Sequence, residues 1–248
     1  MFRKNIEFKV VQAYIEAGLD LPVPAKKNIP QWYKDLDHKL NKKTVKGCMP
    51  FLDALTAGYI IKTPFDLAVV HNKKNPHNPE IAHNNFSSVH EASDSVRELN
   101  IPFNHTNEFH QPFQMEGSPL VDKNLGMGFH KFVSPWIIKT PPGYSCLFIS
   151  PMNNKDDRFD IISGIVDTDT FDMPINFPFV INGDKYKSIE TLIEKGTAMV
   201  QVIPFKRDTW QMRVKTYKNV DLHKSIVKLF SKFFNKYKTM YWSKKSWR

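Results

Sequence analysis

The sequence predicts a mainly β protein whose strands form a β-clip or jelly-roll-like barrel or sandwich. Aromatic residues make up 13% of the chain, and 17 prolines outnumber 10 glycines. This composition favours strands and proline-containing loops over a helical bundle. Short apolar runs separated by turn sequences recur between Phe129 and Arg207, as they do in sandwiches and barrels. We therefore expect one domain over residues 1–248, with a few short helices and a C-terminal amphipathic helix.

The N-terminal part of the chain predicts short strands that alternate with short helices. Apolar residues indicate a first strand within Asn5–Tyr14. A proline at the first helical turn predicts a helix over Gln31–Leu40, because proline suits that position. A further helical turn is expected to end at Gly58, before strands at Tyr59–Lys62 and Leu67–His71.

Residues 71–115 predict an insertion or a loop-rich region. Polar sequence such as KKNPHNPEIAHNN dominates this part of the chain, and such composition is typical of loops. Within it, weak strand character is present at Glu80–His83, and a short helix is expected at Val89–Leu99.

The β core is predicted over residues 129–207. Its apolar runs are separated by the turn sequences TPPG, NNKDD and NGDK, and regular spacing of this kind indicates successive strands. The expected strands are Phe129–Val133, Trp136–Lys139, Tyr144–Ile149, Phe159–Val166, Ile175–Ile181 and Ala198–Phe205.

Positive charge is concentrated in the C-terminal segment. The formal net charge is +10, and residues 206–248 contain 13 lysines and arginines but only two acidic residues. Residues 221–242 predict a basic amphipathic helix with Ile226 and Tyr237 on its apolar stripe. The stripe favours packing on the sheet, whereas the lysines suit nucleic acid, a protein partner or an anionic membrane surface. These lysines are Lys224, Lys228, Lys232 and Lys236.

Three sequence stretches resemble, in order and spacing, the central part of the dUTPase family. They are TPPGYSCLFISPMNN, GIVDTDTF and IEKGTAMVQVIPF. The family shows a PPGY-type turn, a PRSG motif, a GVIDxDYRG motif and a strand beginning GDRIAQ. Upstream, Ala57, Gly58 and Tyr59 are similar to the start of its AGYDL motif. The chain departs from the family at SPMN, which replaces PRSG, and at Ile60, which replaces the aspartate of AGYDL.

The resemblance implies a trimeric β-clip protein that binds or hydrolyses a nucleotide-like ligand, with Mg²⁺ as the candidate cofactor. Asp167 matches the family's water-activating carboxylate, and Asp169, two residues further on, is the second candidate catalytic residue. The competing interpretation is that both carboxylates cap a turn. The remaining candidate ligand-binding residues are Tyr59, Ser150, Asn153, Asn154, Phe171 and Gln201.

A second resemblance covers most of the chain. The strings PAKKNIPQW, GCMPFLDALTAGYII, PWIIKTPPGYSCLF and QVIPFKRDTW are similar to an uncharacterised family of bacteria and tailed phages, including phages of marine cyanobacteria. This resemblance implies a biological context without a known chemistry. A non-enzymatic module that binds nucleic acid or a partner during assembly therefore competes with the nucleotide-hydrolase hypothesis.

A metal site is the third hypothesis for function. Six of the nine histidines fall between His71 and His110. Glu108 and His110 have the spacing of the first two ligands in a non-haem iron facial triad, as in 2-oxoglutarate oxygenases. No histidine occurs between His130 and His223 to supply the distal ligand, and histidines of a solvated loop are the alternative interpretation.

The sequence also predicts the cellular location of the protein. Only Cys48 and Cys146 are present, and the start MFRKNIEFKV holds no apolar stretch of signal-peptide length. No apolar run approaches the length of a membrane-spanning helix. We expect a cytoplasmic protein without a transmembrane segment, in the host cytoplasm if a phage encodes it.

Overall fold

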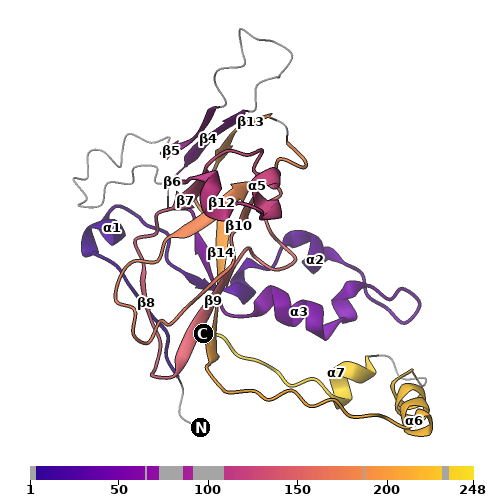
Figure 1. Ribbon diagram of the computed structural model, residues 1–248. Coiled ribbons are helices and arrows are strands. Elements are labelled where there is room, and N and C mark those ends of the chain that lie inside the picture. Colours follow the sequence, from indigo (N-terminus) through magenta and orange to yellow (C-terminus); the bar gives the residue numbers. More distant parts are fainter. Residues whose placement is uncertain (1–3, 65, 73–85, 92–108, 187, 231–234) are drawn as a thin grey trace.

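The fold is mainly β, and the strands of the described residues form four antiparallel sheets (Figure 1). A computed structural model describes residues 4–64, 66–72, 86–91, 109–186, 188–230 and 235–248. Short helices lie between and beside the sheets, and two helices follow the last strand. Within the described residues the helices are α1 Gln12–Glu16, α2 Gln31–Asp35, α3 Met49–Thr56, α5 Pro119–Lys123, α6 Asn219–Phe230 and α7 Lys236–Met240, with 3₁₀ turns η1 Ala25–Asn28, η2 Val45–Gly47 and η3 Pro112–Met115.

The largest sheet has five strands in the order β11-β9-β14-β3-β2. β14 lies at its centre, and Val200 and Val202 of this strand are completely buried. Lys206, the last residue of β14, pairs with Tyr144 at the start of β9. The strands are β2 Val23–Pro24, β3 Tyr59–Lys62, β9 Tyr144–Ile149, β11 Gly164–Val166 and β14 Ala198–Lys206.

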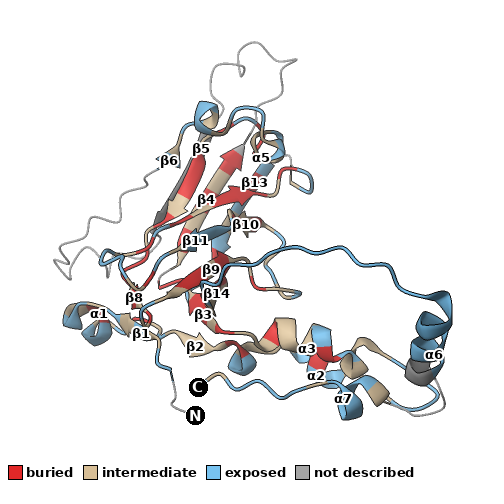
Figure 2. Ribbon diagram, turned by 60° about the horizontal axis from the view of Figure 1, so that its bottom comes forward, coloured by how far each residue is buried: buried red, intermediate tan, exposed pale blue. Residues whose placement is uncertain are grey.

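Three smaller sheets complete the β structure, in the orders β10-β12-β7-β6, β13-β4-β5 and β1-β8. One cluster of buried side chains draws on all four sheets and includes Phe177, Val69, Met199 and Ile138; Figure 2 shows it in red. The strands are β1 Glu7–Lys9, β4 Leu67–Asn72, β5 Phe86–Glu91, β6 Phe109–His110, β7 Phe129–Phe132, β8 Ile137–Lys139, β10 Phe159–Ile161, β12 Phe177–Ile181 and β13 Ser188–Ile193.

The helices α2 and α3 form a helical flank beside β2 and β3 (Figure 2). Aromatic packing joins them, because the Tyr33 and Phe51 rings stack at 5.9 Å and Trp32 meets Phe51 edge-on at 6.1 Å. A proline in its first turn helps to start α3, since that position has no helical hydrogen bond to lose. The C-terminal end of the chain lies beside this flank.

The sequence predicted several strands closely and misplaced others. β3 and β9 have the predicted bounds. The predicted strand Phe159–Val166 is instead two strands in different sheets, because β10 pairs with β12 and β11 pairs with β9. The segment Asn5–Tyr14 turns into α1 after β1. β13 was not predicted, although its burial alternates.

The loop-rich region of residues 71–115 contains more strand than expected. β5 pairs with β4 over its whole length, so the predicted helix Val89–Leu99 is wrong for its first three residues. The rest of that helix and the weak strand Glu80–His83 lie outside the described residues.

The C-terminal segment leaves the β body after β14. Residues 206–227 are all exposed, and α6 stands apart from the sheets in both ribbon views (Figures 1 and 2). The expected packing of its apolar stripe on a sheet is therefore wrong for Ile226, which is 43% exposed. Among the residues described, no helix combines the length and the apolar character that crossing a membrane requires.

Two glycines in the left-handed region provide a test of the close packing between β3 and β14. Gly58 has φ +66°, and a Cβ there would lie 1.9 Å from the carbonyl oxygen of Val202. Gly143 has φ +82° with nothing within 4 Å of such a Cβ. We expect Gly143→Ala to lower the free energy of unfolding by about 1–2 kcal/mol through backbone strain alone, and Gly58→Ala to lower it further because β14 must move. Urea denaturation followed by circular dichroism measures both, and equal losses would contradict the expectation.

Candidate functional site

The two aspartates after β11 lie beside the start of β9. Val166 pairs with Cys146, so the chain leaves β11 next to Ser145, whose hydroxyl donates to Asp167 Oδ1 at 2.6 Å. The Asp169 carboxylate accepts the Gly143 N–H at 2.8 Å. It also binds the Arg207 guanidinium through both oxygens, with Nη1 at 2.8 Å from Oδ1. Arg207 Nη1 lies 3.1 Å from Asp167 Oδ1 as well.

These two carboxylates therefore differ in their surroundings. The Asp169 side chain is 6% exposed, whereas the Asp167 side chain is 59% exposed. Hydrogen bonds from Arg207, and then from the Gly143 N–H, hold the pKa of Asp169 far below its ordinary value. Asp169 thus stays ionised and joins two turns to the end of β14. Asp167 keeps an exposed carboxylate that could meet a ligand.

Phe171 belongs to the same turn as the aspartates. Its N–H donates to the Asp167 carbonyl at 3.0 Å, and its ring is 41% exposed. Lys139 crosses to this turn, where its ammonium donates to the Asp169 carbonyl at 3.1 Å. The structure thus brings together Asp167, Asp169 and Phe171, which are close in sequence.

Gln201 occupies a different place, in the core of the main sheet. Its side chain is buried, and its Nε2 donates to the carbonyls of Ala54 at 2.9 Å and Ala57 at 2.8 Å. Its Oε1 accepts the Met152 N–H at 2.7 Å. This amide joins the end of α3 and the turn after β9 to β14, so its hydrogen bonds are used within the protein.

The turn after β9 holds Ser150, Asn153 and Asn154. The Ser150 hydroxyl accepts the Ile161 N–H at 2.8 Å. Asn153 has φ +59°, and the Asn154 N–H donates to a carbonyl within the turn. Ser150 lies five residues beyond Ser145 along β9, which places it about 17 Å from the aspartate turn.

Tyr59 lies at a third place, beside the C-terminal end of the chain. Its ring meets Phe8 at 5.5 Å and Trp247 at 6.3 Å, edge-on in both cases. Its hydroxyl donates to the Arg248 carbonyl at 3.2 Å, and burial raises the pKa of the phenol. The predicted ligand-binding residues are therefore divided among three locations, and the aspartate turn does not meet the Ser150 turn.

The metal hypothesis stays a prediction. Glu108 lies outside the described residues. His110 of β6 pairs with Phe129 of β7. Within the described ranges, no three His, Cys, Asp or Glu side chains are placed to share a metal ion.

The predicted basic residues of the tail are only partly described. Lys224 lies on the exposed part of α6, and Lys236 begins α7. Lys232 lies outside the described residues, and the structure describes only the backbone of Lys228. The expected single helix over residues 221–242 is replaced by α6 and α7, with Asn235 at φ +60° before α7.

Two further features were missed by sequence reasoning. The extended segment before α6 exposes Trp210, Met212 and Val214 by 87–88%, and polar or basic residues alternate with them. This period of two was visible in the sequence. The second feature is a cavity that the last residues form with α3 and η1, which joins segments too distant in sequence to be predicted.

Comparisons with known proteins leave the family open. The chain matches no protein-family model, no curated protein and no solved structure. Both family resemblances therefore stay predictions, and the function has to be inferred from the geometry.

The ion pair of Asp169 predicts a pH-dependent stability. The folded-state pKa of Asp169 lies below its ordinary value, so its stabilising contribution is present above the unfolded pKa of about 3.9 and is lost as pH falls further. We expect Asp169→Asn to be less stable than the wild type at pH 7, with a difference that shrinks below about pH 4. Urea denaturation between pH 7 and pH 3 measures this.

The matched control is Asp172→Asn. This aspartate is 79% exposed and pairs with Lys139, and exposed pairs contribute little. A stability difference for Asp169→Asn that does not change with pH would contradict a role for the charge.

Proposed function

We propose that the protein is a nucleic-acid-binding module whose β-clip or jelly-roll-like body displays a basic C-terminal segment to a single-stranded DNA or RNA. The observation that carries the proposal is the exposed stretch of residues 207–227, in which the aromatic residues Trp210 and Tyr217 lie among five lysines and arginines. Such stretches bind single strands by pairing cations with phosphates while aromatic rings stack on bases.

Charge supports this assignment. Residues 206–248 account for all of the net charge of +10, because their 13 basic and two acidic residues outweigh a remainder with 22 basic and 23 acidic residues. Arg213, Lys215 and Lys218 are exposed along the segment. A nucleic acid would therefore be drawn to this segment rather than to the β body.

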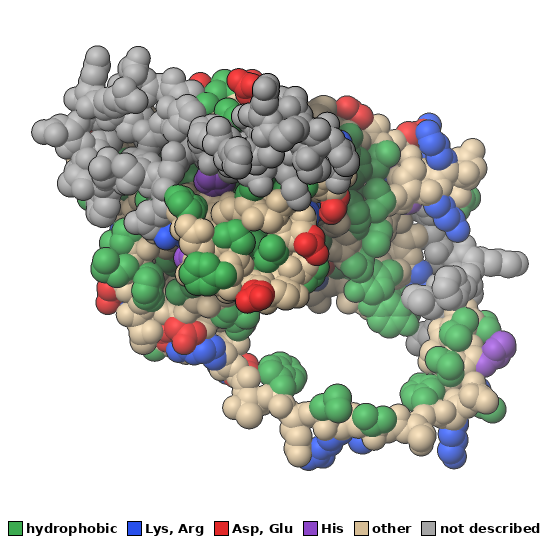
Figure 3. Space-filling model, turned by 45° about the horizontal axis from the view of Figure 1, so that its top comes forward, with side chains coloured by type: hydrophobic (Ala, Val, Ile, Leu, Met, Phe, Trp, Pro, Cys, Tyr) green, Lys and Arg blue, Asp and Glu red, His purple; other side chains and the backbone are tan. Residues whose placement is uncertain are grey.

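The exposed aromatic residues favour a single strand over a duplex. Trp210 is 88% exposed and Tyr217 is 65% exposed, which is unusual for side chains of this size. In Figure 3 the segment stands away from the body with open space between them, and hydrophobic and basic side chains occur along it. Rings in this position can stack on the unpaired bases of a strand.

Removing the ring of Trp210 tests the stacking. We expect Trp210→Ala to weaken binding of a single-stranded oligonucleotide by about 1–3 kcal/mol, because one base loses its stacking partner. Trp210→Phe retains an aromatic ring and should retain most of the affinity. Fluorescence anisotropy with a labelled oligonucleotide measures both variants, and equal affinity for all three proteins would contradict the proposal.

The salt dependence tests the cations separately. We expect Arg213→Gln with Lys215→Gln to reduce the slope of log affinity against log salt by about 0.7 for each phosphate that is no longer neutralised. The control is Lys9→Gln with Lys185→Gln, which removes the same charge from exposed positions on the body. An equal change of slope for both pairs would show that only the total charge matters.

Nucleotide hydrolysis at Asp167 is the second candidate function. It is favoured by the exposed carboxylate of Asp167, which accepts a hydrogen bond from Ser145 and faces solvent beside Phe171. This carboxylate matches the water-activating position of the dUTPase resemblance. Asp169 is engaged by Arg207 and would hold the turn rather than react.

A hydrolysis assay decides this second function. With dUTP and Mg²⁺, the wild type should release pyrophosphate, and Asp167→Asn should remove most of that activity because the general base is lost. Asp172→Asn, in the same exposed turn, should leave it unchanged. Absence of turnover in the wild type, or equal turnover in both variants, would exclude Asp167 as the base.

A further inference from the structure

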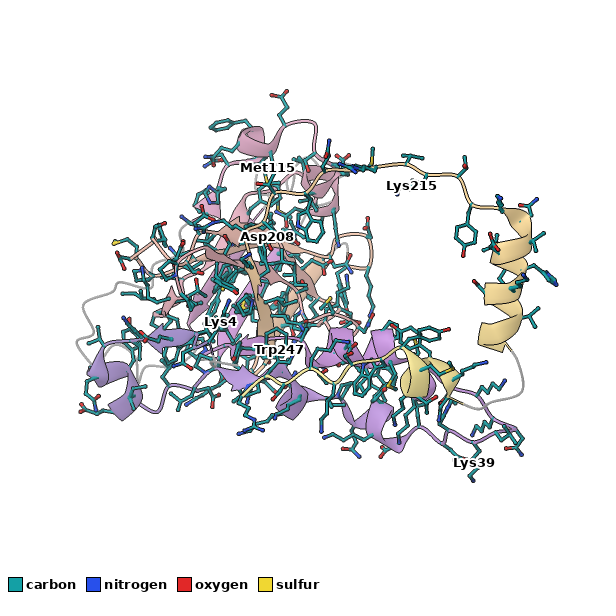
Figure 4. All side chains as sticks on the ribbon, turned by 90° about the horizontal axis from the view of Figure 1, so that it is seen from below. Lys4, Lys39, Met115, Asp208, Lys215 and Trp247 are labelled. Atoms are coloured by element: carbon teal, nitrogen blue, oxygen red, sulfur yellow. The ribbon has the colours of Figure 1, made fainter. Side chains whose placement is uncertain are left out.

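A cavity of about 360 Å³ lies where the C-terminal end of the chain returns to the helical flank. Trp242 and residues 244–248 form one wall, and α3 with the η1 turn forms the other. Figure 4 labels Trp247 beside the body and Lys215 far out on the exposed segment. None of the lining residues belongs to the aspartate turn or to the extended stretch around Trp210.

An anchor at Asp53 holds this wall in place. The Trp242 indole N–H lies 3.1 and 3.0 Å from the two Asp53 oxygens, and the Lys245 ammonium lies 2.6 Å from Oδ2. The Lys245 ammonium also lies 5.6 Å from the centre of the Trp242 ring. Tyr59 fixes the far end of the wall, through its ring contact with Trp247 and its hydrogen bond to Arg248.

Two half-buried indoles line the cavity. Trp242 and Trp247 both border it, and neither is fully covered by protein. An indole face is the most favourable side chain for stacking on a flat aromatic ligand, and base stacking of this kind tolerates any nucleobase.

The cavity also carries an excess of positive charge. Lys26, Lys244 and Arg248 border it, and in the described part of the chain none of them forms an ion pair with a carboxylate. The acidic side chain among the lining residues, Asp53, is already engaged by Lys245 and Trp242. An anion that entered the cavity would therefore meet Lys26 and Lys244, which form no ion pair with a carboxylate of the described residues.

We propose that this cavity binds a phosphorylated nucleoside, with the base against the Trp242 and Trp247 indoles and the phosphate beside Lys26 and Lys244. The volume lies at the lower end of the range of about 300–1,000 Å³ for small-molecule sites, which suits one nucleotide. The ligand is either a free nucleotide or the 5′-phosphorylated end of a strand. This site does not depend on strand binding by residues 207–227.

Calorimetry on the full chain tests the ligand class without any substitution. We expect adenosine 5′-monophosphate to bind at least about tenfold more tightly than adenosine or inorganic phosphate alone, because only the nucleotide uses both halves of the cavity. If the nucleotide binds no more tightly than inorganic phosphate, the indoles contribute nothing and the proposal is overturned.

Substitutions then locate the site. Lys26→Gln with Lys244→Gln should weaken nucleotide binding about tenfold while leaving adenosine unchanged, and Lys9→Gln with Lys185→Gln should leave both unchanged. Trp247→Ala should weaken binding of the nucleotide and of adenosine by about 5- to 150-fold, and Trp247→Phe should restore most of it. If Lys26→Gln with Lys244→Gln bound the nucleotide with wild-type affinity, the proposal would be overturned.

Two comparisons are needed. The first distinguishes a free nucleotide from a 5′-phosphorylated strand end as the ligand, and the second distinguishes the cavity from the strand-binding segment as the site. A 5′-phosphorylated oligonucleotide that binds more tightly than its unphosphorylated form, and that adenosine 5′-monophosphate displaces, identifies a strand end; equal binding of the two identifies the free nucleotide. Trp210→Ala should leave nucleotide affinity unchanged. A parallel loss of nucleotide binding in Trp210→Ala would place the ligand on the extended segment and overturn the cavity as its site.

Discussion

The ion pair between Arg207 and Asp169 determines where the C-terminal segment leaves the β body. Asp169 is nearly buried and also accepts the Gly143 N–H, while the Arg207 N–H donates to the Gly143 carbonyl at 2.8 Å. β14, the turn before β9 and the turn after β11 are thus joined at one point. Charge-assisted bidentate pairs fix orientation strongly, so the chain beyond Arg207 starts from a fixed position and direction.

A second anchor, at Asp53, holds the C-terminal end of the chain against α3. Trp242 and Lys245 bind this carboxylate on α3, and Trp247 reaches Tyr59. Between the two anchors, residues 206–227 are exposed throughout, whereas Asn235 lies near the helical flank, with its Oδ1 3.4 Å from His38 Nε2. The two carboxylates therefore divide the molecule into a nearly neutral β body and a basic segment held at both ends, and the proposed strand-binding surface and nucleotide cavity both belong to that segment.

The candidate sites show which spatial relations a sequence can predict. Asp167, Asp169 and Phe171 are brought together because a tight turn joins them. Ser150 is also near them in sequence, yet β9 and β11 run antiparallel and place it at the opposite end of the strand pair. Gln201 interrupts an apolar run, which indicated a special role, but only the contacts with Ala54, Ala57 and Met152 show that this role is structural.

The sequence by itself determined the β content, the bounds of β3 and β9, and the concentration of positive charge after β14. These properties depend on local composition and on the period of two along a strand. The tertiary structure alone decided that residues 159–166 divide between two sheets, that α6 stays off the sheets, and that Lys26, Asp53 and Trp247 share one cavity. Such choices depend on contacts between residues far apart in the chain, which a local pattern does not specify.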